Sequence, residues 1–225
     1  FKIFIDGEAG TTGLKVAERL KTHPQASILG IDAAHRKDES ARADMMAASD
    51  ITILCLPDAA AIDATRLAAE SKTRLIDASS AHRTHSEWVY GFAELQPGQR
   101  DVIATAALIT NPGCYPTAAI KAQYPLIKNR LIETKNIIID AKSGYSGAGR
   151  EKIESELGEK ISNNFIPYNF FKHRHNPEIT QELAKVSKEK IDVTFSPHIL
   201  PLFRGILETI YVRKTSDVPD EIIEE

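Results

Sequence analysis

The sequence has no long hydrophobic run and no excess of positive charge. Its longest apolar stretches, Ile51 to Leu56 and Ile137 to Ile139, are far shorter than the roughly 20 residues needed to cross a bilayer. Lysine and arginine total 28 against 31 aspartate and glutamate residues, for a net charge of −3. A protein that binds the phosphate backbone of nucleic acid usually carries the opposite balance. We therefore expect neither a membrane nor a nucleic acid as a partner.

Cysteine is scarce, and the start of the sequence lacks the features of a secretion signal. Phe1 opens directly into strand-like sequence, with no charged leader, apolar stretch or small-residue cleavage site, which favours a cytoplasmic protein. Cys55 and Cys114 are the two cysteines, and two thiols in 225 residues do not form a disulfide scaffold. Each thiol therefore needs its own explanation.

The sequence does contain enough apolar residues, 42% of 225, to bury a sizeable core. In the first half, short apolar runs alternate with amphipathic segments. We expect strands at residues 2–6, 27–32, 50–56, 74–78 and 102–110, and helices at 14–21, 39–48 and 58–70. The unbroken apolar run at 50–56 indicates a strand buried on both faces. Repeated βα units of this kind predict an α/β fold with a Rossmann-like, doubly wound parallel sheet.

Beyond Asn111 the pattern becomes mixed. We expect helices at 115–128, after Pro177 and at 218–225, and strands at 136–141, 192–195 and 206–212. Together these predict an α+β domain. The turn residues Asn111, Pro112 and Gly113 separate the two patterns. The expected domains are therefore residues 1–113 and 114–225.

Three glycines at intervals of three lie between the first expected strand and the first expected helix. In such a turn, backbone amides approach a pyrophosphate at the N-terminus of the helix. We predict a dinucleotide site formed by Gly7, Gly10, Thr11, Thr12 and Gly13. The alternative is a glycine-rich turn that binds no ligand.

The residues after the second expected strand bear on the choice of dinucleotide. Asp32 alone would favour the ribose hydroxyl of NAD, whereas the nearby cations Arg36 and Lys37 can hold the 2′-phosphate of NADP. We therefore predict NADP(H). In the alternative interpretation, Arg36 and Lys37 begin a solvated charged stretch with Asp38 and Glu39.

The two cysteines have different sequence surroundings. Cys55 lies in an apolar strand, where burial raises the pKa of a thiol, so we interpret it as structural. Cys114 lies in a turn that opens a helix, where backbone amides and the helix dipole stabilise a thiolate. This setting predicts a nucleophile. The alternative is an unreactive cysteine at a helix start.

A nucleophilic thiol needs a proton-transfer partner, and His173 and His175 are the candidates. Either imidazole can hold the thiolate as an ion pair and later protonate an alkoxide, and the sequence does not choose between them. Histidines two residues apart also occur among metal ligands. No third ligand with suitable spacing accompanies them, so we expect no metal.

Further candidates lie in a glycine-dense segment and at isolated arginines. The segment from 142 to 150 can approach a flat ring or present amides, and we assign Ser143, Gly144 and Gly147 to cofactor binding. A linker loop is the alternative. Arg83 and Arg204 are candidate anion clamps, although most single arginines are surface charges. With Asn111 they form our expected substrate site.

Several segments in order resemble the N-acetyl-gamma-glutamyl-phosphate reductase family, part of the semialdehyde dehydrogenase superfamily, and in particular its shorter second type. The similarity covers nearly the whole chain. The matching segments are 5–13, 88–92, 111–117, 143–150, 173–178, 197–201 and 204–205, with the residues around Arg83.

The resemblance implies a reaction. Cys114 would attack the acyl phosphate of N-acetyl-L-glutamyl 5-phosphate, and NADPH would reduce the resulting thioester to the 5-semialdehyde, a step of arginine biosynthesis. It also implies that residues 1–113 bind the dinucleotide. Residues 114–225 would then form a catalytic and oligomerisation domain of a homo-oligomer, a dimer or a tetramer.

Family members usually continue with a segment that returns to the dinucleotide domain, and we expect that segment to be missing from these 225 residues. Two other functions stay open. One is an aspartate-semialdehyde dehydrogenase, although Gly113, Tyr115 and Pro116 look less like that branch. The other is a nucleotide-binding module without a working cysteine.

Overall fold

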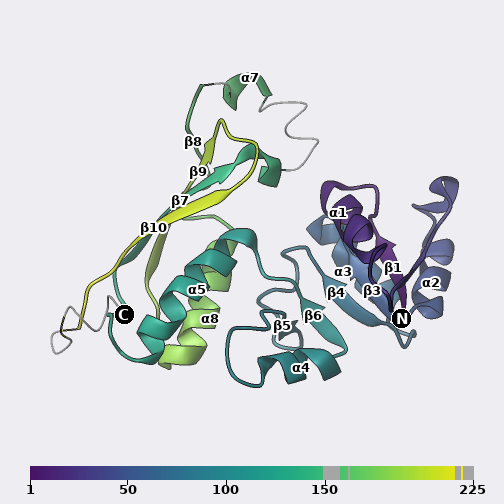
Figure 1. Cartoon of the computed structure of the whole chain (residues 1–225), viewed down its shortest axis with the longest axis horizontal. Helices are drawn as coiled ribbons and strands as arrows, with labels where there is room; N and C mark the ends of the chain where they lie inside the picture. Colours follow the sequence, from purple (N-terminus) through teal and green to yellow (C-terminus); the bar gives the residue numbers. More distant parts are fainter. Residues whose placement is uncertain (149–157, 162, 216–218, 220–225) are drawn as a thin grey trace. The chain divides into compact units, whose positions relative to one another are not determined.

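The computed structural model describes residues 1–148, 158–161, 163–215 and 219. The chain divides into two compact units, Phe1–Pro112 and Gly113–Glu225, and each is described by itself (Figure 1). Two expectations lie outside the described residues: the helix at 218–225, apart from residue 219, and the end of the glycine-dense segment at 149–150.

The first unit is built on a six-stranded parallel sheet with the order β2-β1-β3-β4-β6-β5. The strand order reverses beside β1, as in doubly wound sheets. The predicted Rossmann-like sheet is therefore confirmed. Its strands are β1 (Lys2–Asp6), β2 (Ser27–Leu29), β3 (Ile51–Leu54), β4 (Arg74–Asp77), β5 (Val89–Tyr90) and β6 (Leu108–Thr110).

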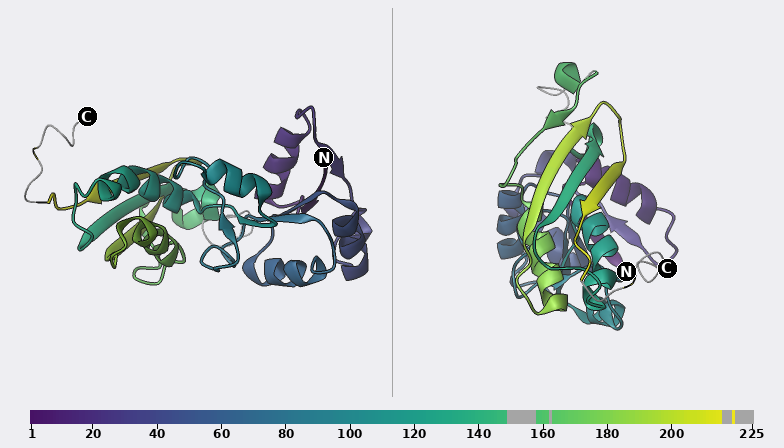
Figure 2. Two further views of the ribbon diagram at one scale, coloured as in Figure 1. Left: turned by 90° about the horizontal axis from the view of Figure 1, so that it is seen from below. Right: turned by 90° about the vertical axis from the view of Figure 1, so that its left-hand side faces the viewer.

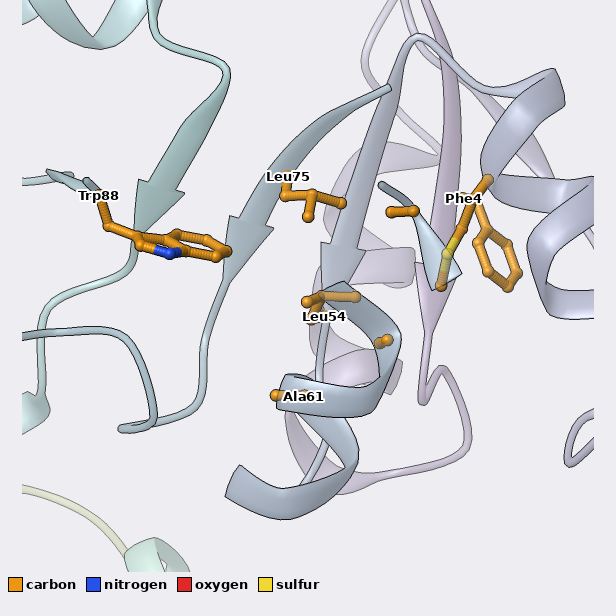
Figure 3. Packing of buried hydrophobic residues seen from close by; sticks show 8 residues of the cluster. Phe4, Leu54, Ala61, Leu75 and Trp88 are labelled. Carbon is orange, nitrogen blue, oxygen red and sulfur yellow. The ribbon is translucent and has the colours of Figure 1, made fainter. Parts of the chain in front are cut away.

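Helices cover both faces of this sheet, because alternate strand residues point to opposite sides. Phe4 of β1 packs in one apolar cluster with Leu54, Leu75 and helix residues such as Ala61 (Figure 3). Ile3 and Ile5 of the same strand pack with α1 on the other face. The helical segments are α1 (Thr11–Leu20), η1 (Ala33–His35), α2 (Glu39–Ala48), α3 (Asp58–Leu67) and α4 (Gln99–Thr105).

The strands of the first unit end in register, which aligns the loops that follow them. Asp6 pairs with Leu54, Leu54 with Asp77, and Asp77 with Thr110. The glycine turn after β1 and Asn111 after β6 therefore lie at the same carboxyl edge of the sheet. Ligands of open α/β sheets bind at this edge.

The strand expected at residues 102–110 is wrong over its first part. Residues 99–105 form α4, and β6 covers Leu108–Thr110 alone. Gly98, with φ +80°, precedes the helix, and Val102 is exposed rather than part of a buried strand. Arg74 of β4 donates to the carbonyls of Ile103 and Ala106 at the end of α4. This stabilising contact is more than 25 residues away in sequence, so a local pattern does not reveal it.

The second unit pairs a mixed sheet with two long helices, as the predicted α+β domain requires. The sheet has the order β10-β7-β9-β8; β7 and β9 are parallel, and the outer strands are antiparallel to them. Its strands are β7 (Ile137–Gly144), β8 (Ile166–Pro167), β9 (Val193–Leu200) and β10 (Ile206–Tyr211). Its helical segments are α5 (Cys114–Lys128), η2 (Tyr145–Ala148), α7 (Gly158–Ile161) and α8 (His175–Ser187).

Helices α5 and α8 lie side by side against this sheet (Figures 1 and 2). Ile137, Ile139 and Ala141 of β7 are fully buried, whereas Ile138 between them is exposed. The opposite face of the sheet thus presents apolar residues, including Leu207 and Tyr211 of β10. Within the described residues, no helix has both the length and the apolar character to cross a membrane.

Candidate active site

Cys114 is the first residue of α5, and its side chain is exposed. Gly113 adopts an extended conformation at the N-cap, and its carbonyl accepts hydrogen bonds from the amide and the hydroxyl of Thr117. Pro116 brings no N–H group to this first turn. The other amides at the start of α5 belong to Cys114 and Tyr115. The helix therefore presents its positive end beside the thiol.

A buried carboxylate lies directly behind this turn. Glu178, in the first turn of α8, is 1% exposed, and its Oε1 accepts a hydrogen bond of 2.7 Å from the amide of Gly113. The carboxylate thus lies in the first turn of α8 and against the N-cap of α5. Helix N-termini favour a negative charge at such positions.

Both predicted histidines are buried at the start of α8. The amide of His175 donates to Nδ1 of His173 at 3.1 Å, so His173 carries its ring proton on Nε2. Burial, with a smaller contribution from the Arg174 guanidinium, lowers the pKa of His173 to about 4. His173 is therefore a neutral N–H donor at pH 7. In the described parts of the chain, no three His, Cys, Asp or Glu side chains gather as metal ligands.

The ring of Tyr115 brings these groups together. It contacts the rings of His173, His175 and Phe195, with centroids 6.0, 5.7 and 5.3 Å away. Its hydroxyl donates to the carbonyl of His198 at 3.3 Å. Burial raises the pKa of Tyr115, and a hydrogen bond with Ser143 partly offsets the rise. Both histidines thus lie against the residue that follows Cys114.

Two further groups at this place were not predicted. Tyr168 donates from its hydroxyl to that of Tyr115 at 3.5 Å, and burial raises its pKa. Glu208 of β10 pairs with Ala141, whose side chain faces the helices, so the register turns its carboxyl inward. Both carboxyl oxygens are buried without a hydrogen-bond partner among the described residues, and burial raises the pKa of Glu208 to about 8.

The predicted dinucleotide loop is packed tightly on backbone atoms. Gly7 has φ +89°, and a Cβ there would lie 2.4 Å from the carbonyl oxygen of Cys55. A Cβ on Gly13 would lie 2.3 Å from the Gly7 oxygen. The amide of Gly10 donates to that same oxygen at 3.0 Å. Positions 7 and 13 therefore require glycine, because any larger residue would prevent the loop from folding against β3 and α1.

The loop leads into α1, whose first residues, Thr11 and Thr12, are exposed. At the base of the loop, Asp6 accepts hydrogen bonds from Nε and Nη2 of Arg42 at 3.1 and 2.8 Å. Both side chains of this ion pair are largely buried. The pair fixes the end of β1 against α2.

The residues chosen for the 2′-phosphate lie at the surface after η1. Arg36 and Lys37 are exposed, and Asp32 uses its carboxylate to accept from the amide of Ala34. Asp38 caps α2 by accepting from the amide of Ala41 at 2.8 Å. The two acids thus serve local turns, and the two cations face solvent.

Cys55 follows β3 and lies at the expected structural position. Burial raises the pKa of its thiol to about 11, with smaller contributions from the carboxylates of Asp6 and Asp77. The expected rise is confirmed. At pH 7 this thiol is protonated and unreactive.

The glycine-dense segment is more regular than the loop we expected. Ser143 and Gly144 end β7, and Gly147 lies in η2. A Cβ on Gly144 would lie 2.7 Å from the amide of Arg204, and Gly144 itself donates to the carbonyl of Gly205. The structure therefore places Gly144 directly against Arg204, whose exposed guanidinium lies 5.2 Å from the centre of the Phe203 ring.

Arg83 and Asn111 are also brought together, in the first unit. Arg83 is 9% exposed, and its guanidinium donates to the carbonyls of Asn111 and Ala78 at 3.0 Å each. Asn111 donates from its side chain to the carbonyl of Pro112. Arg83 thus holds the backbone at the start of the turn that leads to Cys114.

Comparison with known proteins gives consistent matches. Residues 114–225 match the family model described as semialdehyde dehydrogenase, dimerisation domain, and residues 34–104 match the one described as semialdehyde dehydrogenase, NAD binding domain. The N-acetyl-gamma-glutamyl-phosphate reductase of Pelotomaculum thermopropionicum is 38% identical, over 100% of this chain and 75% of that protein. The reductase of the same name from Brucella anthropi is 45% identical, over 92% of this chain and 67% of its own length.

Solved structures share the fold at lower identity. Aspartate semialdehyde dehydrogenase II from Vibrio cholerae superposes with a TM-score of 0.74 at 18% identity, covering 99% of this chain and 77% of that one. The Candida albicans aspartate semialdehyde dehydrogenase, solved with NADP, gives a TM-score of 0.70 at 15% identity over 99% and 74%. At such identities the likeness establishes the fold alone.

Proposed function

The chain belongs to the N-acetyl-gamma-glutamyl-phosphate reductase family, and we propose that it reduces N-acetyl-L-glutamyl 5-phosphate to N-acetyl-L-glutamate 5-semialdehyde and phosphate. NADP(H) is its cofactor. The proposal depends most on one observation. Cys114 is exposed at the first position of α5, while His173 and His175 lie buried around the ring of the next residue.

The first half of the reaction uses Cys114 as nucleophile. Its thiolate attacks the acyl carbonyl carbon, a C–S bond forms, and the C–O bond to phosphate breaks as inorganic phosphate leaves with the electron pair. The positive end of α5 favours the thiolate and the oxyanion that develops on the substrate. Amides placed as oxyanion donors contribute about 3 to 4 kcal/mol each in comparable sites.

The second half reduces the thioester, whose carbonyl is a better hydride acceptor than a carboxylate or an oxygen ester. When bound, NADPH supplies the hydride. The residues present suit this cofactor: Gly7 and Gly13 let the loop fold tightly on its own backbone before α1, and Arg36 and Lys37 are exposed cations for a 2′-phosphate. We assign Gly10, Thr11 and Thr12 to the pyrophosphate.

The two histidines receive different roles. His173, neutral at pH 7 with its proton on Nε2, donates a hydrogen bond without changing charge. His175 is therefore our choice for the group that holds the thiolate, protonates the thiohemiacetal oxygen, and takes that proton back as the C–S bond breaks to release the aldehyde and the Cys114 thiolate. Its place at the start of α8, against the Tyr115 ring, supports this choice.

The remaining candidates belong to binding. We propose that Ser143, Gly144 and Gly147 contribute to cofactor binding, and that Arg204 beside Gly144 holds an anionic group of the substrate. Arg83 acts on the substrate site through Asn111, because two of its donors hold main-chain carbonyls.

Assembly and cellular role complete the proposal. The match to a dimerisation domain indicates a homo-oligomer, and we propose a dimer or a tetramer. The exposed face of the second sheet, with Ile138, Leu207 and Tyr211, supports a contact between copies. Family membership is the basis for three further parts of the proposal: the place in arginine biosynthesis, the small acyl phosphate substrate and the cytoplasmic location.

The test is phosphate-dependent reduction of NADP by N-acetyl-glutamate 5-semialdehyde. We expect turnover by the unaltered chain and a loss of at least about 1,000-fold in Cys114→Ser, with unchanged NADPH binding. Cys55→Ser is the control and keeps its activity. Substantial turnover by Cys114→Ser would refute the mechanism. Turnover of aspartate semialdehyde alone would refute the proposed substrate.

A further inference from the structure

We infer that Glu178 is a positioning residue that fixes the peptide before Cys114 onto α8, the helix that begins at His175. The inference rests on the proposed role of Cys114 as nucleophile. It assigns a function to a buried acid that neither binds substrate nor transfers a proton in the mechanism above.

The contact includes a short hydrogen bond between distant parts of the second unit. The amide of Gly113 donates to Oε1 of Glu178 at 2.7 Å, within the range of bonds strengthened by a charged acceptor. Gly113 is the N-cap of α5, so this bond fixes the residue from which the helix and Cys114 start. Burial of Glu178 to 1% exposure keeps water from replacing the carboxylate.

The charge of Glu178 suits this place. A carboxylate in the first turn of one helix and at the N-cap of another meets the positive ends of two helix dipoles. A buried acid without such partners would be costly. The position therefore accommodates a charged acceptor that holds both helix starts in one arrangement.

The geometry links the thiol to its proton-transfer partner. His175 is the first residue of α8 and Glu178 lies three residues later, in the same first turn. The side chain of Glu178 reaches back to the residue before Cys114. One acid thus sets the separation of the sulfur and the imidazole. A misplacement of about 1 Å between reacting groups can lower a rate by about 100-fold.

Glu182 provides a matched control on the same helix. It is 2% exposed and lies one turn after Glu178, with its carboxylate accepting from Nζ of Lys185 and from the side chain of Gln181. These partners lie on α8 itself. Substitution of Glu182 therefore reports the cost of removing a buried acid from this helix without touching the turn at Cys114.

The experiment compares Glu178→Gln and Glu178→Leu with Glu182→Gln and Glu182→Leu. Gln retains an Oε1 acceptor, whereas Leu has a side chain of similar size to Glu but no acceptor. We expect Glu178→Leu to lower kcat about 100-fold with KM for NADP within about twofold, because the loss concerns alignment rather than cofactor binding. Glu178→Gln should recover most of that loss, to within about tenfold of the unaltered chain.

The outcomes are exclusive. Equal losses in Glu178→Gln and Glu178→Leu would overturn the inference, because the acceptor geometry would then have no effect. Equal losses in the Leu variants of Glu178 and Glu182 would also overturn it. Circular dichroism and thermal unfolding identify a variant that has lost its fold. If a Leu variant has done so, the kcat of Glu178→Gln is compared with that of Glu182→Gln instead, and equal values would overturn the inference.

A second measurement separates this inference from the proposed function. Protein labelled with ¹⁵N-glycine shows the amide of Gly113 among only 12 glycines, and its hydrogen exchange reports the bond without any turnover. We expect exchange at least about tenfold faster in Glu178→Leu and unchanged in Glu182→Leu. If the unaltered chain has no reductase activity but the exchange result holds, the proposed function fails and the anchoring contact stands. If exchange is unchanged in Glu178→Leu, the inference fails.

Discussion

The glycine turn after β1 yields the sharpest prediction, because the clash produced by each added methyl group is known. In Gly13→Ala, the new Cβ would lie 2.3 Å from the oxygen of Gly7, 2.7 Å from Cα of Glu8 and 2.8 Å from the oxygen of Glu8. All three are backbone atoms, so no flexible side chain can move aside. The loop must withdraw from the start of α1.

The size of the effect follows from that displacement. Ordinary contact requires the Gly7 carbonyl to move by about 1 Å, and overpacking of this kind costs about 1 to 3 kcal/mol. If the cost falls on the loop proposed to bind the dinucleotide, the Kd for NADPH rises roughly 5- to 150-fold. Gly7→Ala adds the strain of φ +89° to a contact of 2.4 Å and should also lower the free energy of unfolding.

Two other glycines serve as controls in the same NADPH fluorescence titration. Gly30→Ala meets no atom within 4 Å and should behave as the unaltered chain. In Gly10→Ala, the new Cβ would lie 3.3 Å from the Gly7 oxygen, so this variant should fold normally. It should lose affinity for NADPH only through contact of its methyl group with the bound pyrophosphate. Urea unfolding of each variant separates lost affinity from lost stability. If Gly13→Ala bound NADPH as tightly as Gly30→Ala, the assignment of this loop would be wrong.

Two further predictions concern the thiols and the histidines. Iodoacetamide at pH 8 should label the exposed Cys114 and spare Cys55, whose pKa is raised to about 11 by burial; peptide mass spectrometry checks this, and equal labelling would contradict it. His173 has a pKa of about 4 when folded and 6.5 ordinarily, so the unfolded chain binds the proton first and stability falls as the pH drops from 6.5 to 4, by up to about 3 kcal/mol. His173→Asn should remove this part of the pH dependence in urea unfolding, and an unchanged slope would exclude His173 as its source.

Much of the first unit could be predicted because its signals are local. A strand, three spaced glycines and a helix follow one another within the first 20 residues. The two-sided burial of β3 is visible as an unbroken apolar run. Each of these signals comes from neighbours in sequence, which is what a periodic pattern records.

The sequence-based predictions fail or are incomplete where contacts between residues far apart in sequence determine the local structure. Val102 and Ile103 have side chains typical of strands, yet they lie in α4. Arg74 of β4 donates to carbonyls at the C-terminal end of this helix. The role proposed for Glu178 depends on a hydrogen bond from the amide of Gly113, and no local sequence pattern connects these two residues. Glu208 looks like an ordinary polar position in an edge strand, and only the pairing with β7 turns it inward. The proposed roles of His173 and His175 likewise rest on their burial and on the hydrogen bond between them, neither of which a local pattern shows.

The bond from Gly113 to Glu178 has a consequence for the making of the protein, because it joins positions 65 residues apart. Ribosomes deliver the chain from its N-terminus, so the whole first unit and all of α5 are synthesised before this acceptor exists. Until α8 emerges, the amide of Gly113 has no Glu178 side chain to donate to, so this hydrogen bond can form only after residues 114–177 have been synthesised.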